Sequence, residues 1–429
     1  MAALVDQARQ RKVNIWVEHF VAALFKTPDG SRIAGALVID QHSGELTLVK
    51  ARAVVLCSGG GGLMYAVTTN AASNTADGYA LALRLGVELV DMEMIQFHPT
   101  GMIMPASMRG KLVTEGVRGE GGRLYNRDGE RFMERYNPQR LELAGRDEVA
   151  RAIFSEVQAG RGTAEGGVYL SVAHLAPAII EERLPTMLAQ FLAAGVDIRT
   201  QPMQIHPSMH HMMGGVRIDE WGGCNLTGLF AAGEVSGGDH GGNRLGGNAL
   251  ASCQVMGKRA AVSAAKFAAE HPNPVDIDAD QVNAELIRLG RYLVADTSTP
   301  ITPTAALTEL QSLMWANVGI KRTAGPLAEA LTRLAELKRH FADHVRAAKT
   351  ELAFNRQWIA CLELENMIDT AQTVVYAALL REDSRGAHFR DDFPTPVASW
   401  ERRNIVIQSH TDPALPDRMR YQIVDQSQL

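Results

Sequence analysis

Paired cysteines and long apolar runs are both missing from this sequence of 429 residues. The longest apolar run covers the seven residues Val374–Leu380, whereas a membrane-spanning helix needs about 20. The N-terminal stretch Met1–Val13 carries charged residues where a secretory signal would have an apolar core. We therefore predict no direct membrane span, and we expect any contact with a membrane to go through partner chains.

The four cysteines do not form a metal-binding pattern. No two of them stand in a CxxC motif, and none has a His or Cys neighbour at the spacing of zinc or iron–sulfur ligands. The sequence therefore predicts a reduced, cytoplasmic chain with no metal site or cluster of its own. A formal net charge of −5 and an isoelectric point of about 6.2 provide no basic field, so we predict no nucleic-acid partner.

The phosphate-binding loop of a nucleotide enzyme is missing as well. Glycines at the first GxG spacing occur at four places, but none has the third glycine that completes GxGxxG. A Walker A loop is excluded because Gly257-Lys258 is followed by Arg259 rather than by Ser or Thr. Nevertheless the chain holds 39 glycines, many of them in clusters such as residues 59–62. Clustered glycine indicates that the backbone approaches a ligand closely.

Hydrophobic patterning predicts short strands near the N-terminus and long helices near the C-terminus. We expect helices at Ala2–Arg11, Asn74–Leu85, Ile179–Ala194 and within residues 282–381, and strands at Val13–Val17, Ile33–Asp40, Leu46–Val49, Ala53–Cys57 and Leu229–Ala232. Apolar stripes such as Leu327 to Phe341 and Ala360 to Ala378 read as core seams between helices. Four prolines in the last 40 or so residues predict an extended tail that wraps the surface.

Polar residues gather among glycines in four segments. They are QFHPTG at 96–101, TEGVRGEGG at 114–122 with Gly145-Arg146-Asp147 downstream, PSMHHMMGG at 207–215 and HGGNRLGGNAL at 240–250. Together they supply at least three arginines and two histidines on flexible backbone. Such a set suits a small dianion, because an Arg fork binds one carboxylate and His or Thr donors can hold the other.

These segments, with several others, run in the order of a known family. The matching stretches include TTNAASNTADG (68–78), GERFMERY (129–136), GRDEVARAI (145–153), AAGEVSGGDHGGNRLGGNAL (231–250), LELENMIDTA (362–371) and SRGAHFRDDFP (384–394). With them the chain resembles the flavoprotein subunit of succinate dehydrogenase and fumarate reductase over about residues 5–405.

The resemblance implies FAD as cofactor and succinate or fumarate as substrate. Carried over by motif, the residues that would hold the dicarboxylate are His98, Thr114, His210 and Arg244. Arg146 would donate the proton to fumarate or accept it from succinate, and Glu115 and Arg118 would relay that proton. Hydride would pass between flavin N5 and the substrate carbon on the side opposite Arg146. An ordinary acid such as His98 stays the alternative proton donor, because a free guanidinium has a pKa above about 12.

The same comparison implies the residues that contact FAD, which are Asp77, Glu234, Ala249 and Leu250. The family usually has Ser at the position of Ala249, Tyr at that of His211 and Ala at that of Gly242. Its members pass electrons to an iron–sulfur subunit, and many also assemble with membrane anchor subunits. We therefore expect a cytoplasmic protein, or one held at the cytoplasmic side of the inner membrane by its partner subunits.

The fold implied is an α/β FAD-binding domain with an inserted α+β capping domain and a C-terminal helical domain. Residues 1–96 and 214–265 would form the FAD-binding part, 97–213 the capping part, 266–385 the helical domain and 386–429 the tail. Family members begin with a βαβ unit that bears GxGxxG, and its absence leads us to expect a flavoprotein subunit truncated at the N-terminus. We accordingly expect the isolated chain to bind FAD weakly.

Two other functions fit the sequence. L-aspartate oxidase shares the FAD-binding and capping domains and has similar HPT and RGEG segments, although RLGGNAL and SRGAHFRDDFP fit the dehydrogenase better. A catalytically inactive paralogue that acts as a binding or assembly partner is the other alternative. The sequence leaves open the physiological direction, the electron donor or acceptor, and whether FAD is bound covalently.

Overall fold

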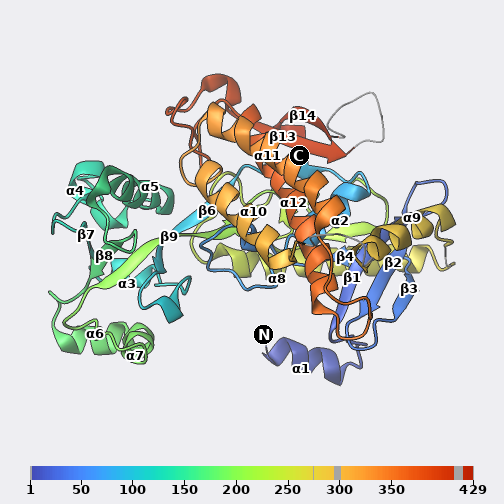
Figure 1. Cartoon of the computed structure of the whole chain (residues 1–429), viewed down its shortest axis with the longest axis horizontal. Helices are drawn as coiled ribbons and strands as arrows, with labels where there is room; N and C mark the ends of the chain where they lie inside the picture. Colours follow the sequence, from blue (N-terminus) through green and yellow to red (C-terminus); the bar gives the residue numbers. More distant parts are fainter. Residues whose placement is uncertain (1, 274, 294–300, 410–418, 429) are drawn as a thin grey trace.

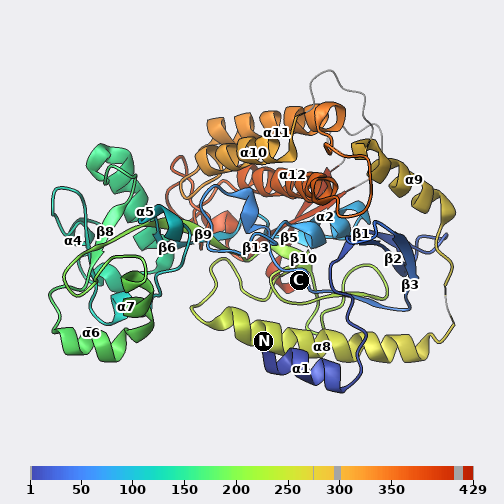
Figure 2. The same ribbon diagram turned by 60° about the horizontal axis from the view of Figure 1, so that its bottom comes forward.

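The computed structural model describes residues 2–273, 275–293, 301–409 and 419–428. Its elements form a central body, with a separate block of one sheet and several helices at one end (Figure 1). Helices α10 (Pro303–Asn317), α11 (Ala324–His344) and α12 (Arg356–Leu380) lie together over the central body in both views (Figures 1 and 2).

The N-terminal part builds an antiparallel sheet at the other end of the molecule. Helix α1 (Ala2–Gln10) precedes strands β1 (His19–Lys26), β2 (Ile33–Asp40) and β3 (Leu46–Lys50), which pair in the order β1-β2-β3. The strand predicted at Val13–Val17 is wrong, because these residues are exposed and pair with no strand. Strand β1 follows them instead, pairs with β2 and buries most of its apolar side chains. Apolar composition alone does not make a strand; a paired neighbour does.

The central body is built around a five-stranded sheet and a parallel pair of strands. The sheet has the order β12-β10-β5-β13-β14 and contains β5 (Leu89–Val90), β10 (Gly215–Arg217), β12 (Ser236–Gly237), β13 (Arg403–Ser409) and β14 (Met419–Asp425). The pair consists of β4 (Val54–Leu56) and β11 (Leu229–Ala231), in parallel register. Helices α2 (Asp77–Arg84) and α8 (Asn248–Glu270) belong to this body, with α8 running along one edge (Figure 2).

The extended surface tail predicted for the last 40 or so residues is wrong where the structure describes it. Strands β13 and β14 form an antiparallel hairpin, and β13 also pairs with β5. Ile405, Val406 and Ile407 are buried there. The strand partner β5 lies more than 300 residues earlier in the chain, so no local pattern announces this pairing. Pro413 and Pro416 of the predicted tail lie outside the described residues.

The separate block contains a four-stranded antiparallel sheet with helices on it (Figure 1). Its strands, in the order β6-β9-β8-β7, are β6 (Ile95–Met102), β9 (Met203–Met212), β8 (Val168–Ser171) and β7 (Arg123–Tyr125). Its helices are α3 (Gly116–Gly119), α4 (Met133–Tyr136), α5 (Arg146–Glu156), α6 (Pro177–Arg183) and α7 (Pro185–Leu192). It has its own cluster of buried apolar side chains, distinct from that of the central body. We call this block the cap unit.

The single helix predicted at Ile179–Ala194 is wrong in one respect. The structure has two helices there, because α6 ends at Arg183 and α7 begins at Pro185. Proline has no backbone N–H to continue the hydrogen-bond ladder of a helix, but it is well suited to the first turn of a new one.

The C-terminal helices are α9 (Ala279–Gly290), α10 (Pro303–Asn317), α11 (Ala324–His344) and α12 (Arg356–Leu380). The expected stripe on α11 is confirmed as a core seam, since Leu327, Leu334, Leu337 and Phe341 are buried and Leu331 is partly buried. Most of the stripe on α12 is buried as well. None of the described helices is long and apolar enough to cross a membrane.

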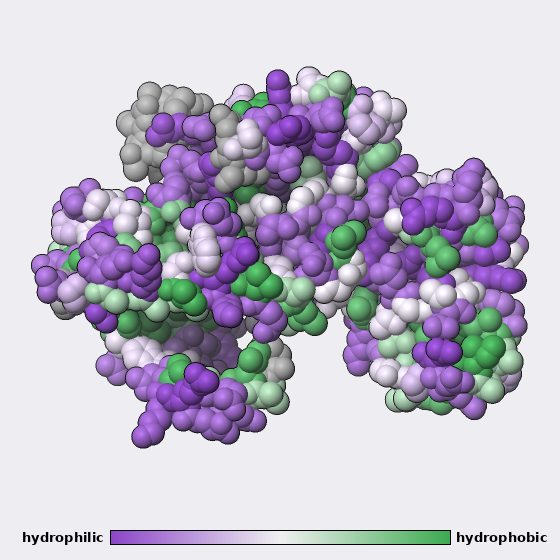
Figure 3. All heavy atoms as spheres, turned by 180° about the vertical axis from the view of Figure 1, so that it is seen from behind, coloured by the Kyte–Doolittle hydropathy of each residue, from purple (hydrophilic) through white to green (hydrophobic). Residues whose placement is uncertain are grey.

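One surface of the central body carries exposed apolar residues. Helix α1 buries none of its residues, and the segment after it exposes Val13, Ile15, Trp16 and Val17. Helix α8 has 23 residues, of which only Met256, Ala260 and Ala264 are buried. Seen from behind, the lower part of the molecule protrudes as a lobe with a hollow above it, and hydrophobic atoms lie near that hollow (Figure 3).

Candidate active site

Glu115 lies between two of the predicted arginines. Arg146, the first residue of α5, donates from Nε and Nη2 to Glu115 Oε2 at 3.0 and 2.5 Å. Arg118 of α3 donates from Nη2 to the other oxygen, Oε1, at 3.5 Å. Arg118 is in turn anchored by its Nη1, which donates to the Glu142 carbonyl oxygen at 2.5 Å. The three residues of the predicted relay are therefore in direct contact, in the order Arg146, Glu115, Arg118.

Arg118 and Glu115 differ in their burial. The Arg118 side chain is buried, and its burial lowers the pKa of the guanidinium below its ordinary value. The Glu115 side chain is 47% exposed, so it reaches solvent. Burial by itself raises the pKa of Glu115, but the hydrogen bond from Arg146 and the charges of Arg146 and Arg118 outweigh it and lower the pKa. Glu115 is therefore a carboxylate at neutral pH and can accept a proton from solvent.

The predicted substrate-holding histidines stand on neighbouring strands. His98 lies on β6 and His210 on β9, with ring centroids 5.1 Å apart in an edge-to-face arrangement. The Thr100 backbone N–H points at His98 Nδ1 at 3.3 Å, so Nδ1 is an acceptor and the neutral ring carries its proton on Nε2. Thr69 Oγ1 lies 2.8 Å from His210 Nδ1.

Both histidines are neutral at physiological pH. Burial is the largest cause that lowers their pKa values, followed by neighbouring positive charges; the pKa of His98 falls well below its ordinary value and that of His210 to about 4. They can therefore donate one N–H each as hydrogen bonds. The same shift argues against His98 as the proton donor, because an acid must hold its proton near neutral pH.

Arg244 and Arg146 share one acceptor. Arg244 is buried and donates from Nη2 to Gln96 Oε1 at 3.0 Å, and Arg146 donates from Nη1 to the same oxygen at 3.3 Å. Burial is the largest cause that lowers the pKa of Arg244, and the charge of Arg146 lowers it further. Arg244 Nε is buried and has no hydrogen-bond partner within the described residues.

Thr114 is a predicted substrate-binding residue that the structure does not tie to the rest of the cluster. It is exposed next to Glu115, and its hydroxyl makes no hydrogen bond to any other described residue. Its contribution to substrate binding stays a prediction.

The cluster carries an excess of positive charge. Within the described residues, Arg118 and Arg146 share one ion-paired carboxylate, that of Glu115, and both histidines are neutral. Arg244 forms no ion pair with a described residue, although the charges of Glu234 and Glu115 act on it from a longer distance. This excess of positive charge, together with single N–H donors and a buried guanidinium that lacks a partner, suits a small dicarboxylate.

A surface suited to a flat cofactor lies beside this cluster. The parallel strands β4 and β11 end at Leu56 and Ala231, and glycine-rich segments follow both of them. Ligands of open α/β sheets bind where the carboxyl ends of neighbouring parallel strands meet. A side chain at Gly60 would place its Cβ 2.3 Å from Glu234 Oε1, so the Glu234 carboxylate would have to move to admit one.

The predicted cofactor-binding residues differ in their exposure and in their hydrogen-bond partners. Ala249 and Leu250 are in the first turn of α8, and Leu250 is 75% exposed. Glu234 accepts the Met212 backbone N–H at 3.0 Å, and burial raises its pKa to about 7. Asp77 instead faces α12, where its oxygens accept from Asn366 Nδ2 and from Thr75 Oγ1, both at 2.7 Å.

His211 supports the fit of this surface to a cofactor. Its Nδ1 lies 3.5 Å from Glu234 Oε2, while its Nε2 is buried with no partner among the described residues. A buried polar atom without a partner is costly unless a ligand or water completes it. A flat, polar ring system such as flavin could cover the exposed apolar side chain of Leu250 and could form a hydrogen bond with His211 Nε2.

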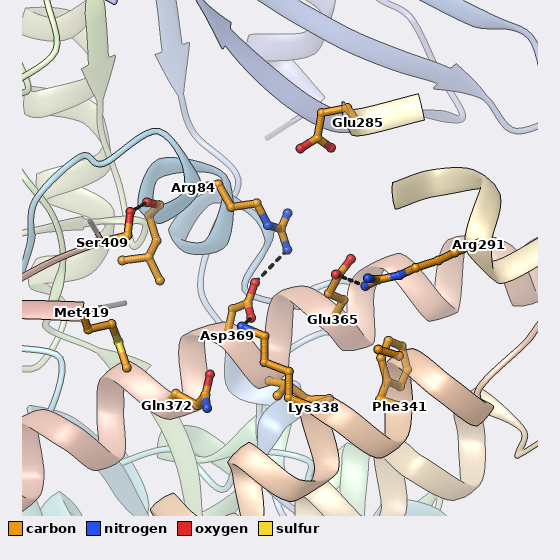
Figure 4. Close-up of a pocket in the computed structure, with 13 residues that line it drawn as sticks. Arg84, Glu285, Arg291, Lys338, Phe341, Glu365, Asp369, Gln372, Ser409 and Met419 are labelled. Carbon is orange, nitrogen blue, oxygen red and sulfur yellow. Dashed lines mark hydrogen bonds and ion pairs between the residues drawn. The ribbon is translucent and has the colours of Figure 1, made fainter. Parts of the chain in front are cut away.

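A cavity of about 490 Å³ lies away from this cluster, between α2, α11 and α12 (Figure 4). Arg84 and Lys338 pair with Asp369 there, at 3.0 and 2.6 Å, and Arg291 pairs with Glu365. Three basic and three acidic residues line it, and none of the predicted site residues does. Because its charges compensate one another, it is a poorer site for a dianion than the arginine cluster.

Sequence reasoning missed three residues of the site. Gln96 bridges the two arginines, Thr69 contacts His210, and Asn243 contacts Gln96 at 2.7 Å. Each stands inside a stretch that was singled out as a whole, but hydrogen-bond partners that are 50 to 148 residues apart are visible only in the fold.

Comparison with known proteins shows the family of this chain. Residues 1–250 match the family model described as FAD binding domain, and residues 307–429 match the one described as Fumarate reductase flavoprotein C-term. One subunit of the CoM/CoB fumarate reductase of Methanothermobacter marburgensis is 46% identical over 417 residues, which cover 96% of this chain and 74% of that protein. L-aspartate oxidase 1 of Ralstonia nicotianae is 37% identical over 400 residues, which cover 92% of this chain and 71% of that protein.

A solved structure shows the same fold. That of Mycobacterium smegmatis Sdh1 in complex with UQ1 has a TM-score of 0.85 at 41% identity, and the match covers 99% of this chain and 71% of the other. The fold and the site thus define an FAD-dependent oxidoreductase. The chain belongs to the family of succinate dehydrogenase and fumarate reductase flavoprotein subunits. The predicted resemblance, enzyme class and FAD cofactor are confirmed.

Proposed function

We propose that this protein interconverts succinate and fumarate. The observation that carries the proposal is the cluster of Arg118, Arg146 and Arg244 around one carboxylate, beside two neutral histidines. Its three guanidiniums share one ion-paired carboxylate, and this suits a substrate with two carboxylates. FAD, when bound, supplies the hydride acceptor for succinate oxidation or the hydride donor for fumarate reduction.

The residues on β6, on β9 and before α8 hold the substrate. Arg244 binds one carboxylate with its guanidinium, including the buried Nε that has no other partner among the described residues. His98, through Nε2–H, and His210 donate to the other carboxylate, together with Thr114. Charge-assisted hydrogen bonds contribute roughly 1.5–3 kcal/mol each, so a few of them suffice for a small diacid.

Arg146 moves the proton. It donates a proton to the substrate carbon during fumarate reduction and accepts one during succinate oxidation. Glu115, which touches both Arg146 and solvent, restores the proton of Arg146, and Arg118 holds Glu115 in place and continues the relay. Positioned acid–base groups of this kind contribute about 10²–10⁴-fold to a rate.

The described residues account for only part of an FAD site. Glu234, Ala249, Leu250 and, although it turns toward α12, Asp77 would contact the flavin. No GxGxxG loop occurs in the 429 residues. We therefore propose that glycines outside this sequence bind the FAD pyrophosphate, on a folded unit that covers the exposed apolar residues of α1, of residues 13–17 and of α8.

Flavin retention tests this part of the proposal. The chain purified alone is expected to lose flavin. A chimera with the N-terminal part of Mycobacterium smegmatis Sdh1 that has no counterpart in this chain joined in front is expected to keep it. A yellow protein with one FAD per chain, purified without any added unit, would contradict this proposal.

Electron transfer is proposed to involve an iron–sulfur subunit, and membrane subunits in addition, with the protein on the cytoplasmic side. The described residues hold no group of three or more His, Cys, Asp or Glu side chains that could bind a metal ion. The clusters that pass electrons onward would accordingly belong to a partner chain.

A second candidate function is L-aspartate oxidation, favoured by the 37% identity to L-aspartate oxidase 1. An L-aspartate ligand carries an ammonium group, which the arginine cluster would repel. An inactive paralogue is the third alternative, although every predicted acid–base residue of the relay is present and in contact.

Two measurements test the proposed function. The first is fumarate binding to the flavin-free chain by calorimetry, with L-aspartate as comparison and Arg244→Gln as the control that should not bind. The second is fumarate reduction by reduced viologen with the flavin-loaded chimera. We expect binding and turnover with fumarate. Preference for L-aspartate would favour the second candidate, and absence of both binding and turnover would refute catalysis.

A further inference from the structure

Gln96 lies at the centre of the arginine cluster. Its side chain is 1% exposed and all of its hydrogen-bonding capacity is used. The oxygen Oε1 accepts from Arg146 Nη1 at 3.3 Å and from Arg244 Nη2 at 3.0 Å. The nitrogen Nε2 donates to Asn243 Oδ1 at 2.7 Å and to the Arg244 carbonyl oxygen at 2.8 Å.

The orientation of this amide is set by its neighbours. A guanidinium has donors only, so the Gln96 oxygen must face the two arginines. On the other side, Asn243 donates from Nδ2 to Asp147 Oδ1 at 3.1 Å. Asp147 can only accept, so Asn243 has to turn its oxygen toward Gln96. The hydrogen bonds that connect Asp147, Asn243 and Gln96 are thus consistent with only one orientation of each amide.

This arrangement joins three segments that are distant in the sequence. Gln96 is on β6, Arg146 and Asp147 open α5, and Asn243 and Arg244 precede α8. The arginines would repel each other without a common acceptor, and burial strengthens that repulsion. One oxygen shared by both guanidiniums therefore sets the distance and angle between Arg244 and Arg146.

We propose that Gln96 is a positioning residue that sets Arg146 relative to Arg244, and thus places the proton donor over the substrate held by Arg244. This inference rests on the proposed succinate and fumarate chemistry. Gln96 itself need not touch the substrate. Its effect is geometric, and misplacement of a reacting group by about 1 Å can cost on the order of 10²-fold in rate.

Two substitutions separate positioning from packing. Gln96→Met keeps the size of the side chain and removes the shared acceptor. Gln96→Glu keeps an acceptor for both arginines but adds a negative charge, which attracts the proton that Arg146 has to release. Gln372→Met on α12 is the matched control, because Gln372 lines the distant cavity.

The measurements are kcat, KM and the pH profile of fumarate reduction by the flavin-loaded chimera, together with the melting temperature. For Gln96→Met we expect kcat to fall about 10–100-fold and KM to rise less. For Gln96→Glu we expect KM near that of the parent, a lower kcat and a shifted pH profile. Gln372→Met should behave as the parent, and all variants should melt within a few degrees of it.

The outcomes distinguish the two levels of inference. Loss of activity in proportion to lost folded protein, with KM and pH profile unchanged in both Gln96 variants, would show a packing role and overturn the positioning role. Full activity of Gln96→Met would overturn it too, while leaving the proposed function intact. A parent and a Gln372→Met control that neither bind nor reduce fumarate would refute the proposed function itself.

Discussion

Arg146 and Glu115 meet through two hydrogen bonds to a single carboxylate oxygen, from Nε at 3.0 Å and from Nη2 at 2.5 Å. The guanidinium is 12% exposed, whereas the carboxylate is 47% exposed. The nearly buried guanidinium, which we propose loses and regains a proton, is thus connected to solvent through the carboxylate of Glu115. The first two predictions test the two ends of this contact.

Replacement of the carboxylate should slow proton return without weakening substrate binding. Glu115→Gln removes the charge while it keeps the shape, and we expect kcat for fumarate reduction to fall about 10²–10⁴-fold with KM within a few-fold of the parent. Steady-state kinetics with reduced viologen measure this. A rise in KM at constant kcat would instead place Glu115 in substrate binding.

Replacement of the arginine should abolish proton donation to the substrate. For Arg146→Gln we expect a fall in kcat of at least about 10²-fold, since the neutral amide cannot act as the acid. Arg127→Gln is the control, because Arg127 lies in the cap unit, is exposed and, among the described residues, forms its ion pair with its neighbour Asp128. If Arg146→Gln turned over fumarate nearly as fast as the parent, another residue would have to donate the proton.

Thr69 should affect affinity more than rate. Thr69 Oγ1 lies 2.8 Å from His210 Nδ1 and 3.3 Å from the Met209 carbonyl oxygen. His210 can present its Nε2–H to a carboxylate when Thr69 donates its one hydroxyl proton to the nearer Nδ1. Thr69→Val removes that donor, and we expect KM for fumarate to rise about 5–10-fold, which corresponds to loss of roughly 1 kcal/mol of hydrogen bonding. Thr308→Val, on exposed α10 surface, should leave KM unchanged. An unchanged KM in Thr69→Val would show that the threonine does not orient His210.

Glu234 should make the stability of the ligand-free chain depend on pH. Its pKa is about 7 in the folded chain and 4.5 when unperturbed, so the folded state holds more protons than the unfolded state between these values. The free energy of unfolding therefore falls as pH rises from about 4.5 to 7. Glu234→Gln does not titrate, and its stability relative to the parent should rise by about 1–3 kcal/mol over that interval.

Urea unfolding at pH 5 and pH 8 measures this difference. The contribution is present at low pH and is lost as pH rises through the folded-state pKa, so parent and variant should converge toward pH 5. A difference that is the same at both pH values would show that Glu234 is not protonated in the folded chain.

The hairpin near the C-terminus should stabilise the central body. Ile407 on β13 is fully buried, whereas Ile423 on the partner strand is 43% exposed. We expect Ile407→Ala to lower the free energy of unfolding by about 2–5 kcal/mol and Ile423→Ala by much less. Chemical unfolding of both variants tests this, and equal effects would contradict the burial of β13.

Some of this protein could be predicted from its sequence because the signals are local. The stripe from Leu327 to Phe341 follows the period of a helix, and the strand at Ile33–Asp40 follows a run of β-branched and apolar residues. The motifs around His98, Arg146, His210 and Arg244 indicated the family and FAD, because a family preserves residue types in order along the chain. Val13–Val17 misled for the same reason, since a local β-type run does not specify a partner strand.

The sequence by itself thus determined the class of chemistry, through the kinds and order of its polar residues, and it determined the absence of a glycine fingerprint within its 429 residues. Only the tertiary structure decided which of those residues act on one another. The pairing of β13 with β5, the shared acceptor Gln96 and the neutral state of His98 each depend on contacts or burial across long sequence separations. Hydrogen bonds and ion pairs form between atoms a few ångströms apart, and the order of residues along the chain does not show which distant residues come that close.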